Sequence, residues 1–170
     1  DGMVQCLKYQ DDEVLCDLWP CPKICDCKGY SLRCCNQNFI LIPLVSPNTK
    51  YLDIKRNKIG HIGSSETIFT SLLILDISYN YISQIQRQDF HMSMSLHMLD
   101  LAYNKIACIK SNSFADLTFL KTLTLTGNPL RELHNFICNR LPKLRYLDLS
   151  LTKLSVIKGT DNLMELSLAV

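Results

Sequence analysis

A repeated pattern of apolar residues and asparagine constrains this chain more than any other feature. Asn57, Asn80, Asn104 and Asn128 are spaced 23, 24 and 24 residues apart. Such a constant period is typical of chains that stack one small unit on the next. The five repeated segments share L-x-L/I-x-x-N-x-I/L-x-x-I/L, with threonine for asparagine in the last: YLDIKRNKIGHI (51–62), ILDISYNYISQI (74–85), MLDLAYNKIACI (98–109), TLTLTGNPLREL (122–133) and YLDLSLTKLSVI (146–157).

This pattern is identified as the leucine-rich repeat, and a sixth copy begins at Leu163. The fold class that it predicts is an α/β repeat solenoid, a horseshoe with a parallel sheet on its concave face. Alternate residues of a strand point to opposite faces, so one set of apolar side chains turns inward. Asparagine side chains can bond backbone groups left unpaired where each strand turns, and stacked copies form a ladder. We expect parallel strands near residues 51–55, 74–78, 98–102, 122–126 and 146–150.

A cluster of cysteines stands directly before the first repeat, where an open solenoid end must be covered. Its spacing is Cys21-x3-Cys25-x-Cys27-x6-Cys34. Zinc is the alternative, but zinc ligands usually come as two close pairs set well apart, and the chain lacks the second pair. We therefore interpret the cluster as a disulfide N-terminal cap, formed in an oxidising compartment. The cluster resembles the cysteine-rich cap of extracellular leucine-rich-repeat proteins, which implies the pairs Cys21–Cys27 and Cys25–Cys34.

The other cysteines, and the segment before the cap, are less informative. Residues 1–16 resemble the end of a low-density-lipoprotein receptor class A module, through Asp1-Gly2, Cys6, Cys16 and Asp12-Glu13. The first four cysteines of such a module are absent, so a solvated acidic linker is the alternative, and we expect no calcium site. The predicted domains are thus residues 1–16, the cap at 17–48 and the repeats at 49–170. The sequence assigns no partner to Cys6, Cys16, Cys35, Cys108 or Cys138.

The order of module, cap and repeats resembles the ectodomain of relaxin-receptor-type leucine-rich-repeat G-protein-coupled receptors. CDCKGYSLRC (25–34) is similar to that family's cap, and FICNRLPKLRYLDL (136–149) to its cysteine-containing repeat. The resemblance implies an extracellular or cell-surface receptor that binds a peptide or protein hormone on its concave face. The alternative is a secreted or matrix interaction or adhesion protein without a signalling domain.

Two groups of exposed concave residues are the candidate ligand contacts. The first is Asp53, Asp76, Asp100 and Asp148, which alternate with core positions and fall in one column. Acidic residues on this face pair with hormone arginines in the relaxin receptors, and such pairs are strong and directional. The second is Tyr79 and Tyr103, since tyrosine is enriched at interfaces. The alternatives are that these aspartates bond only local backbone and that the tyrosines pack on each other.

Other functions have little support in the sequence. The chain carries no G-x-S-x-G, H-E-x-x-H or glycine-rich phosphate loop, and its four histidines lie at unrelated positions of different repeats, so we expect no enzyme, metal or cofactor. The net charge of +2 does not argue for a nucleic-acid partner. Apolar runs are too short to span a membrane, so a membrane link would need a domain outside this chain.

Overall fold

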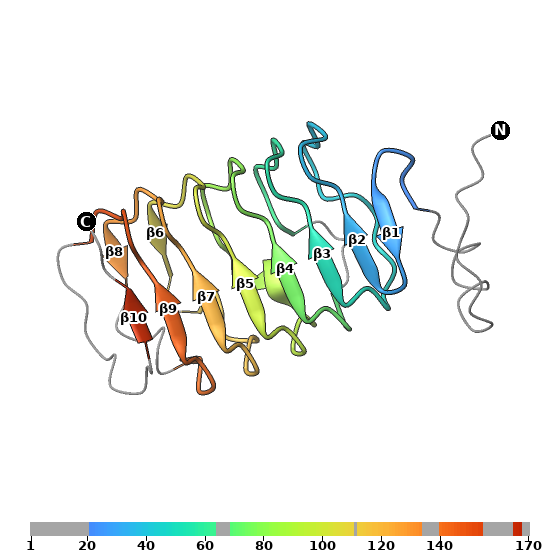
Figure 1. Ribbon diagram of the computed structural model, residues 1–170. Coiled ribbons are helices and arrows are strands. Elements are labelled where there is room, and N and C mark those ends of the chain that lie inside the picture. The colour runs from blue at the N-terminus through green and yellow to red at the C-terminus, as the bar shows by residue number, and fades with distance from the viewer. Residues whose placement is uncertain (1–20, 64–68, 111, 134–139, 155–164, 168–170) are drawn as a thin grey trace.

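The structure is a computed structural model, which describes residues 21–63, 69–110, 112–133, 140–154 and 165–167. The expected module remnant at residues 1–16, and Cys138 with it, lie outside these ranges. The described chain winds into a solenoid that advances by one turn per repeat, with the strands side by side along one face (Figure 1).

The main sheet has eight strands in the order β1-β2-β3-β4-β5-β7-β9-β10. A second sheet of two strands, β6 and β8, lies where the chain continues beyond β5 and β7. The bounds are β1 Asp26–Lys28, β2 Ser31–Arg33, β3 Tyr51–Asp53, β4 Ile74–Asp76, β5 Met98–Asp100, β6 Cys108–Ile109, β7 Thr122–Thr124, β8 Glu132–Leu133, β9 Tyr146–Asp148 and β10 Glu165–Ser167.

All strands from β2 to β10 in the main sheet pair in parallel, so the predicted parallel solenoid is confirmed. Leu52 is opposite Leu75, and the same register continues through Leu99, Leu123 and Leu147. The regular strands are three residues long, shorter than the five predicted. Backbone pairing nevertheless continues beyond them, because Ile54 N–H donates to the Asp76 carbonyl and Arg56 N–H to that of Ser78.

The core is a single stack of inward-facing side chains from successive turns. The predicted core positions are all at most 1% exposed: Leu52, Ile54, Leu75, Ile77, Leu99, Leu101, Leu123, Leu125, Leu147 and Leu149. Phe90 and Phe114 occupy equivalent positions ten residues after successive ladder asparagines, and their buried rings lie 5.8 Å apart. Burial of this apolar surface is the main favourable contribution to folding, and each turn gains it only by contact with its neighbours.

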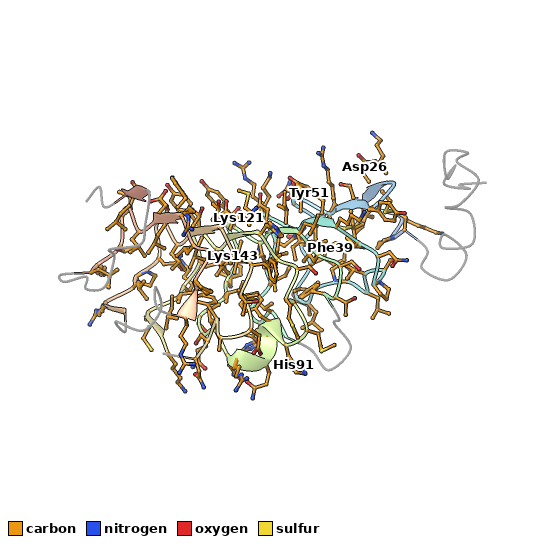
Figure 2. The ribbon with its side chains drawn as sticks, turned by 90° about the horizontal axis from the view of Figure 1, so that it is seen from below. Asp26, Phe39, Tyr51, His91, Lys121 and Lys143 are labelled. Carbon is orange, nitrogen blue, oxygen red and sulfur yellow. A yellow bond between two sulfur atoms is a disulfide. The ribbon has the colours of Figure 1, made fainter. Side chains whose placement is uncertain are left out.

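The opposite side of the solenoid from the main sheet consists mostly of turns. The one helix whose bounds lie within the described residues is a 3-10 helix, η1, at Arg87–Phe90. Figure 2 shows η1 and His91 on the side away from Tyr51 and Lys121, which lie along the sheet. No helix in the described ranges has the length and apolar character needed to cross a membrane.

The N-terminal end is covered by the antiparallel pair β1 and β2, which joins the edge of the parallel sheet. Cys21 is bonded to Cys27 and Cys25 to Cys34, the pairing that the cap resemblance implied. Cys34 is fully buried, and its three partners in the cluster pack against the core. Cys35 and Cys108 are free thiols. These disulfides are consistent with a cap at this end of the solenoid.

The ladder asparagines join each turn to the one before it. The Asn104 side-chain amide donates to the carbonyls of Ile77, in the previous turn, and Leu101, in its own, both at 3.1 Å. Its Oδ1 accepts from Ile82 N–H at 3.0 Å. Asn57, Asn80 and Asn128 repeat this arrangement. At the equivalent position, the one hydrogen bond of the Thr152 side chain within the described part of the chain is donated to the Leu149 carbonyl of its own turn, at 2.7 Å.

Replacing one ladder asparagine should therefore destabilise the fold sharply. Asn104 is 3% exposed, so Asn104→Ala leaves buried backbone groups of two turns without partners. We expect a loss of about 1–3 kcal/mol in the free energy of unfolding, measured by urea denaturation. Lys105→Ala, at the exposed neighbouring residue, is the control and should stay within roughly 0.5 kcal/mol of the wild type. Equal losses for the two variants would contradict the ladder as the source of stability.

Candidate ligand-binding surface

The predicted acidic residues do form one column on the concave face, which we call the Asp column: Asp53, Asp76, Asp100 and Asp148. The strand register places Asp53 opposite Asp76 and Asp76 opposite Asp100, with Thr124 separating Asp100 from Asp148. Neighbouring strands lie about 4.8 Å apart, so adjacent carboxylates repel unless something offsets their charge. The four residues meet this repulsion in different ways.

Lys55 neutralises the first two members of the column. Its Nζ lies 3.2 Å from Asp53 Oδ2 and 3.5 Å from Asp76 Oδ2. The hydrogen bond to Asp53 raises the pKa of Lys55, so the ammonium remains charged. Asp53 is only 5% exposed, and Asp76 also accepts from the hydroxyl and N–H of Ser78. Asp53 is therefore poorly placed to contact a ligand.

Asp148 is held by hydroxyl groups rather than by a cation. Its Oδ1 accepts from the Ser150 hydroxyl at 2.6 Å and from Ser150 N–H at 2.9 Å. The Ser150 hydroxyl also contacts that of Ser167 on β10. Burial alone would raise the pKa of Asp148, but these hydrogen bonds outweigh it and hold the pKa below its usual value.

Asp100 differs from the other three. Among the described residues, it accepts one hydrogen bond, from Ala102 N–H at 2.9 Å, and takes part in no ion pair. Burial, with the charge of Asp76, raises the pKa of Asp100 despite the Ala102 hydrogen bond. The arrangement leaves a partly desolvated carboxylate at the centre of the concave face that an incoming cation would stabilise.

Apolar side chains lie beside the Asp column on the same face. Ile74 and Met98 are opposite each other at the start of β4 and β5, and Met98 is 38% exposed. Leu73, at the edge where β4 begins, is 37% exposed. Tyr51 and Tyr146 occupy the equivalent strand position in other turns. A ligand contacting Asp100 would therefore find apolar surface immediately next to it.

The two candidate tyrosines stack on each other, as the alternative interpretation anticipated. The rings of Tyr79 and Tyr103 lie 4.5 Å apart between centroids and 15° from parallel. The Arg56 guanidinium lies over the other face of Tyr79, at 5.3 Å. Gly127 lies so close to the Tyr103 ring, on the face away from Tyr79, that a Cβ added to it would be 2.6 Å from the ring. Both rings thus have their faces covered, and their exposed edges and hydroxyls are what remains for a ligand.

Two of these interacting residues were missed by inspection of the sequence. Lys55 and Arg56 follow the first strand at the positions that Ser78 and Tyr79 occupy in the next repeat. Aligning these positions, as was done for the aspartates, would have placed Arg56 next to Tyr79. The reach of Lys55 to two carboxylates depends on its side-chain rotamer, for which the repeat pattern carries no signal.

The comparisons with known proteins agree with this architecture. The family described as leucine rich repeat matches residues 47–106 and 70–130. The chain is similar to relaxin receptor 2 of Canis lupus familiaris, with 37% identity over 71 residues, or 41% of this chain and 10% of the receptor. The chain thus contains leucine-rich repeats, and it spans about a tenth of the length of that curated relative.

Three solved structures share the fold. A complex of TLR13 with ssRNA13 has a TM-score of 0.70 and 27% identity, over 77% of this chain and 20% of that one. The functional domain of InlJ from Listeria monocytogenes has a TM-score of 0.64 and 26% identity, over 82% and 30%. Human 5T4, a trophoblast glycoprotein, has a TM-score of 0.61 and 20% identity, over 79% and 64%, which shows the fold alone. Leucine-rich-repeat solenoids of this kind are typically binding scaffolds without enzymatic activity.

The packing of Tyr103 on Gly127 gives a direct stability test. Gly127 has a φ of +69°, and its missing Cβ leaves room for the ring. Gly127→Ala should cost about 1–3 kcal/mol, since it combines backbone strain with displacement of the ring. Gly60→Ala is the matched control, because a Cβ there meets nothing within 4 Å. The measurement is urea denaturation with near-ultraviolet circular dichroism, which should change for Gly127→Ala only.

The pKa directions of Asp100 and Asp148 predict opposite effects of pH on two similar variants. A raised folded-state pKa means that ionisation of Asp100 opposes folding once the pH exceeds the unfolded value, about 3.9. Asp100→Asn should therefore be more stable than the wild type at neutral pH, and this gain should vanish on acidification. The lowered pKa of Asp148 means that its carboxylate stabilises the fold, so Asp148→Asn should be less stable at neutral pH, with the deficit shrinking as the pH falls.

Urea denaturation of the two variants and the wild type between neutral and acid pH would measure both trends. If Asp100→Asn loses stability at neutral pH as Asp148→Asn does, Asp100 is an ordinary satisfied carboxylate.

Proposed function

We propose that this chain is an ectodomain segment of a hormone-binding leucine-rich-repeat G-protein-coupled receptor, and that it binds a peptide or protein ligand on its concave face. In the full-length protein, an extracellular ectodomain of this kind is joined to a membrane-spanning signalling domain. The similarity to relaxin receptor 2 and the disulfide-bonded N-terminal end support the proposal. Disulfides persist in oxidising compartments, which agrees with an extracellular location.

Asp100 is the observation that carries the ligand-binding part of the proposal. The pKa of Asp100 is raised although the charge of Lys55 lowers it, and no ion pair within the described residues includes Asp100. Ionisation of Asp100 therefore reduces stability, and a ligand cation would offset that cost. Asp53 and Asp76 share Lys55, and Asp148 is satisfied by Ser150. Asp100 is therefore the member of the Asp column with the most to gain from a ligand cation.

The surroundings of Asp100 define the chemistry of the ligand. An arginine suits the carboxylate best, because its planar guanidinium can donate two parallel hydrogen bonds. An apolar ligand residue next to that arginine would cover Met98 and Ile74, which the solenoid leaves exposed and half-exposed. Asp76 lies in the adjacent strand and would supply a second, partly neutralised carboxylate.

Binding of relaxin-type peptides, with and without their arginines, tests this function. The loss of one desolvated Arg–carboxylate pair typically costs about 2–5 kcal/mol, and each factor of ten in affinity is about 1.4 kcal/mol. Asp100→Asn should therefore weaken binding of an arginine-containing ligand at least tenfold in isothermal titration calorimetry. Asp76→Asn should have a smaller effect, because Lys55 already balances that charge.

Two controls separate the specific contact from general charge effects. Asp116→Asn removes a carboxylate that pairs with Arg87 away from the concave sheet, and it should leave affinity unchanged. Replacing the ligand arginines by citrulline removes the charge but keeps the shape, and should abolish the difference between wild type and Asp100→Asn. If Asp100→Asn binds the arginine-containing peptides as well as the wild type, the proposed site is wrong.

A further inference from the structure

A row of lysines on the edge of the solenoid stands apart from the Asp column. The residue directly after each ladder position is Lys58, Tyr81, Lys105, Pro129 and Lys153 in successive turns, and we call this row the strand-exit rim. The strands end just before it, on the edge of the solenoid along which β6 and β8 also lie (Figure 1). Equivalent backbone hydrogen bonds to the preceding turn fix Lys58, Tyr81, Lys105 and Lys153, at 2.7–2.9 Å.

The row alternates lysine with residues that carry no charge. Turns of the sheet repeat about every 4.8 Å, so the three lysines stand about 10 Å from one another along a line. Lys58, Lys105 and Lys153 are exposed. No ion pair or cation-π contact within the described ranges includes any of the three. Arg56 adds a further exposed cation two residues before Lys58.

We propose that the strand-exit rim binds a sulfated polysaccharide, laid across the turns so that successive sulfate groups meet Lys58, Lys105 and Lys153. A linear polyanion matches a linear row of unpaired cations, and the release of its counterions favours binding. A small anion would reach only one or two of these lysines. The disulfides place the chain in an oxidising compartment, and the polyanions outside cells are mainly sulfated polysaccharides.

Tyr81 favours a sugar polymer over a nucleic acid. Its ring is 54% exposed and lies in the row between Lys58 and Lys105, where an apolar ring face can pack on a sugar ring between two sulfate contacts. Single-stranded nucleic acid needs several open aromatic faces for successive bases. The neighbouring rings of Tyr79 and Tyr103 cannot supply such open faces. They stack on each other, and Arg56 and Gly127 cover their outer faces.

Binding to immobilised heparin, measured by surface plasmon resonance near physiological ionic strength, tests the proposal. The triple variant Lys58→Gln, Lys105→Gln and Lys153→Gln should bind at least about tenfold more weakly, with a shallower dependence on salt, because fewer counterions are released. The control is Lys121→Gln, Lys143→Gln and Arg145→Gln, which removes the same charge from the edge where the strands begin. Lys121 and Arg145 directly precede β7 and β9, and Figure 2 labels Lys121 and Lys143. The heparin affinity of this control variant should fall by no more than about twofold.

Loss of affinity by the control equal to that of the rim variant, or no heparin binding by the wild type, would overturn the proposal. Tyr81→Ala should also weaken binding, and Tyr81→Phe should restore it. Circular dichroism of every variant would verify that the fold is retained, as expected for exposed side chains.

Competition identifies the class of polyanion. Heparin should displace the protein from the immobilised surface, whereas desulfated heparin, single-stranded oligouridylate and phosphatidylserine vesicles should do so poorly. Effective competition by the RNA or by the vesicles would overturn the assignment to sulfated polysaccharide. Asp100→Asn should leave heparin binding intact, so this test and the peptide-binding test of the concave face can fail independently.

Discussion

The stacking of buried asparagines is the interaction on which the rest of the structure depends. Each ladder side chain donates hydrogen bonds to carbonyls of two successive turns, and its Oδ1 accepts a hydrogen bond from a backbone N–H of the preceding turn, as Asn104 does from Ile82. At a sharp turn, backbone N–H and C=O groups do not pair with each other, and the asparagine side chain supplies their hydrogen bonds instead. A buried group left without a hydrogen bond costs free energy. The residue before each of Asn57, Asn80, Asn104 and Asn128 takes a positive φ, between 53° and 69°. The ladder thereby sets the direction of the side chains in the strand before each asparagine and of those that follow it.

Strict stacking also brings like residues together, and the structure resolves the resulting repulsion unevenly. In the Asp column, Lys55 balances Asp53 and Asp76, and hydroxyls satisfy Asp148. Asp100 receives one backbone hydrogen bond and sits beside the charge of Asp76, with its pKa raised chiefly by burial. A half-buried carboxylate with one hydrogen bond and no ion pair within the described residues, at the centre of the sheet face, is where an external cation would contribute most.

The sequence predicted the repeat positions, the parallel strands and the core, because each depends on a period that can be counted. Leu52, Leu75 and Leu99 share a register because the spacing between them matches one turn. The differences within the Asp column were not predictable in the same way. The residue two positions after each aspartate varies, as Lys55, Ser78, Ala102 and Ser150. The repeat pattern does not show, however, that the Lys55 side chain also reaches Asp76 in the next turn, or that Ser150 contacts Ser167 on β10.

The two surfaces use different positions of the same repeat, which lets them vary independently. The Asp column lies within the strands and faces the concave side, whereas Lys58, Lys105 and Lys153 follow the ladder residues at the edge. A solenoid transmits interactions mainly between adjacent turns, and exposed side chains in different rows share few partners, so substitutions in one row should act additively with those in the other. Because one repeat position can change without disturbing the core, a single scaffold can present an acidic surface to a cationic ligand and a basic edge to a polyanion.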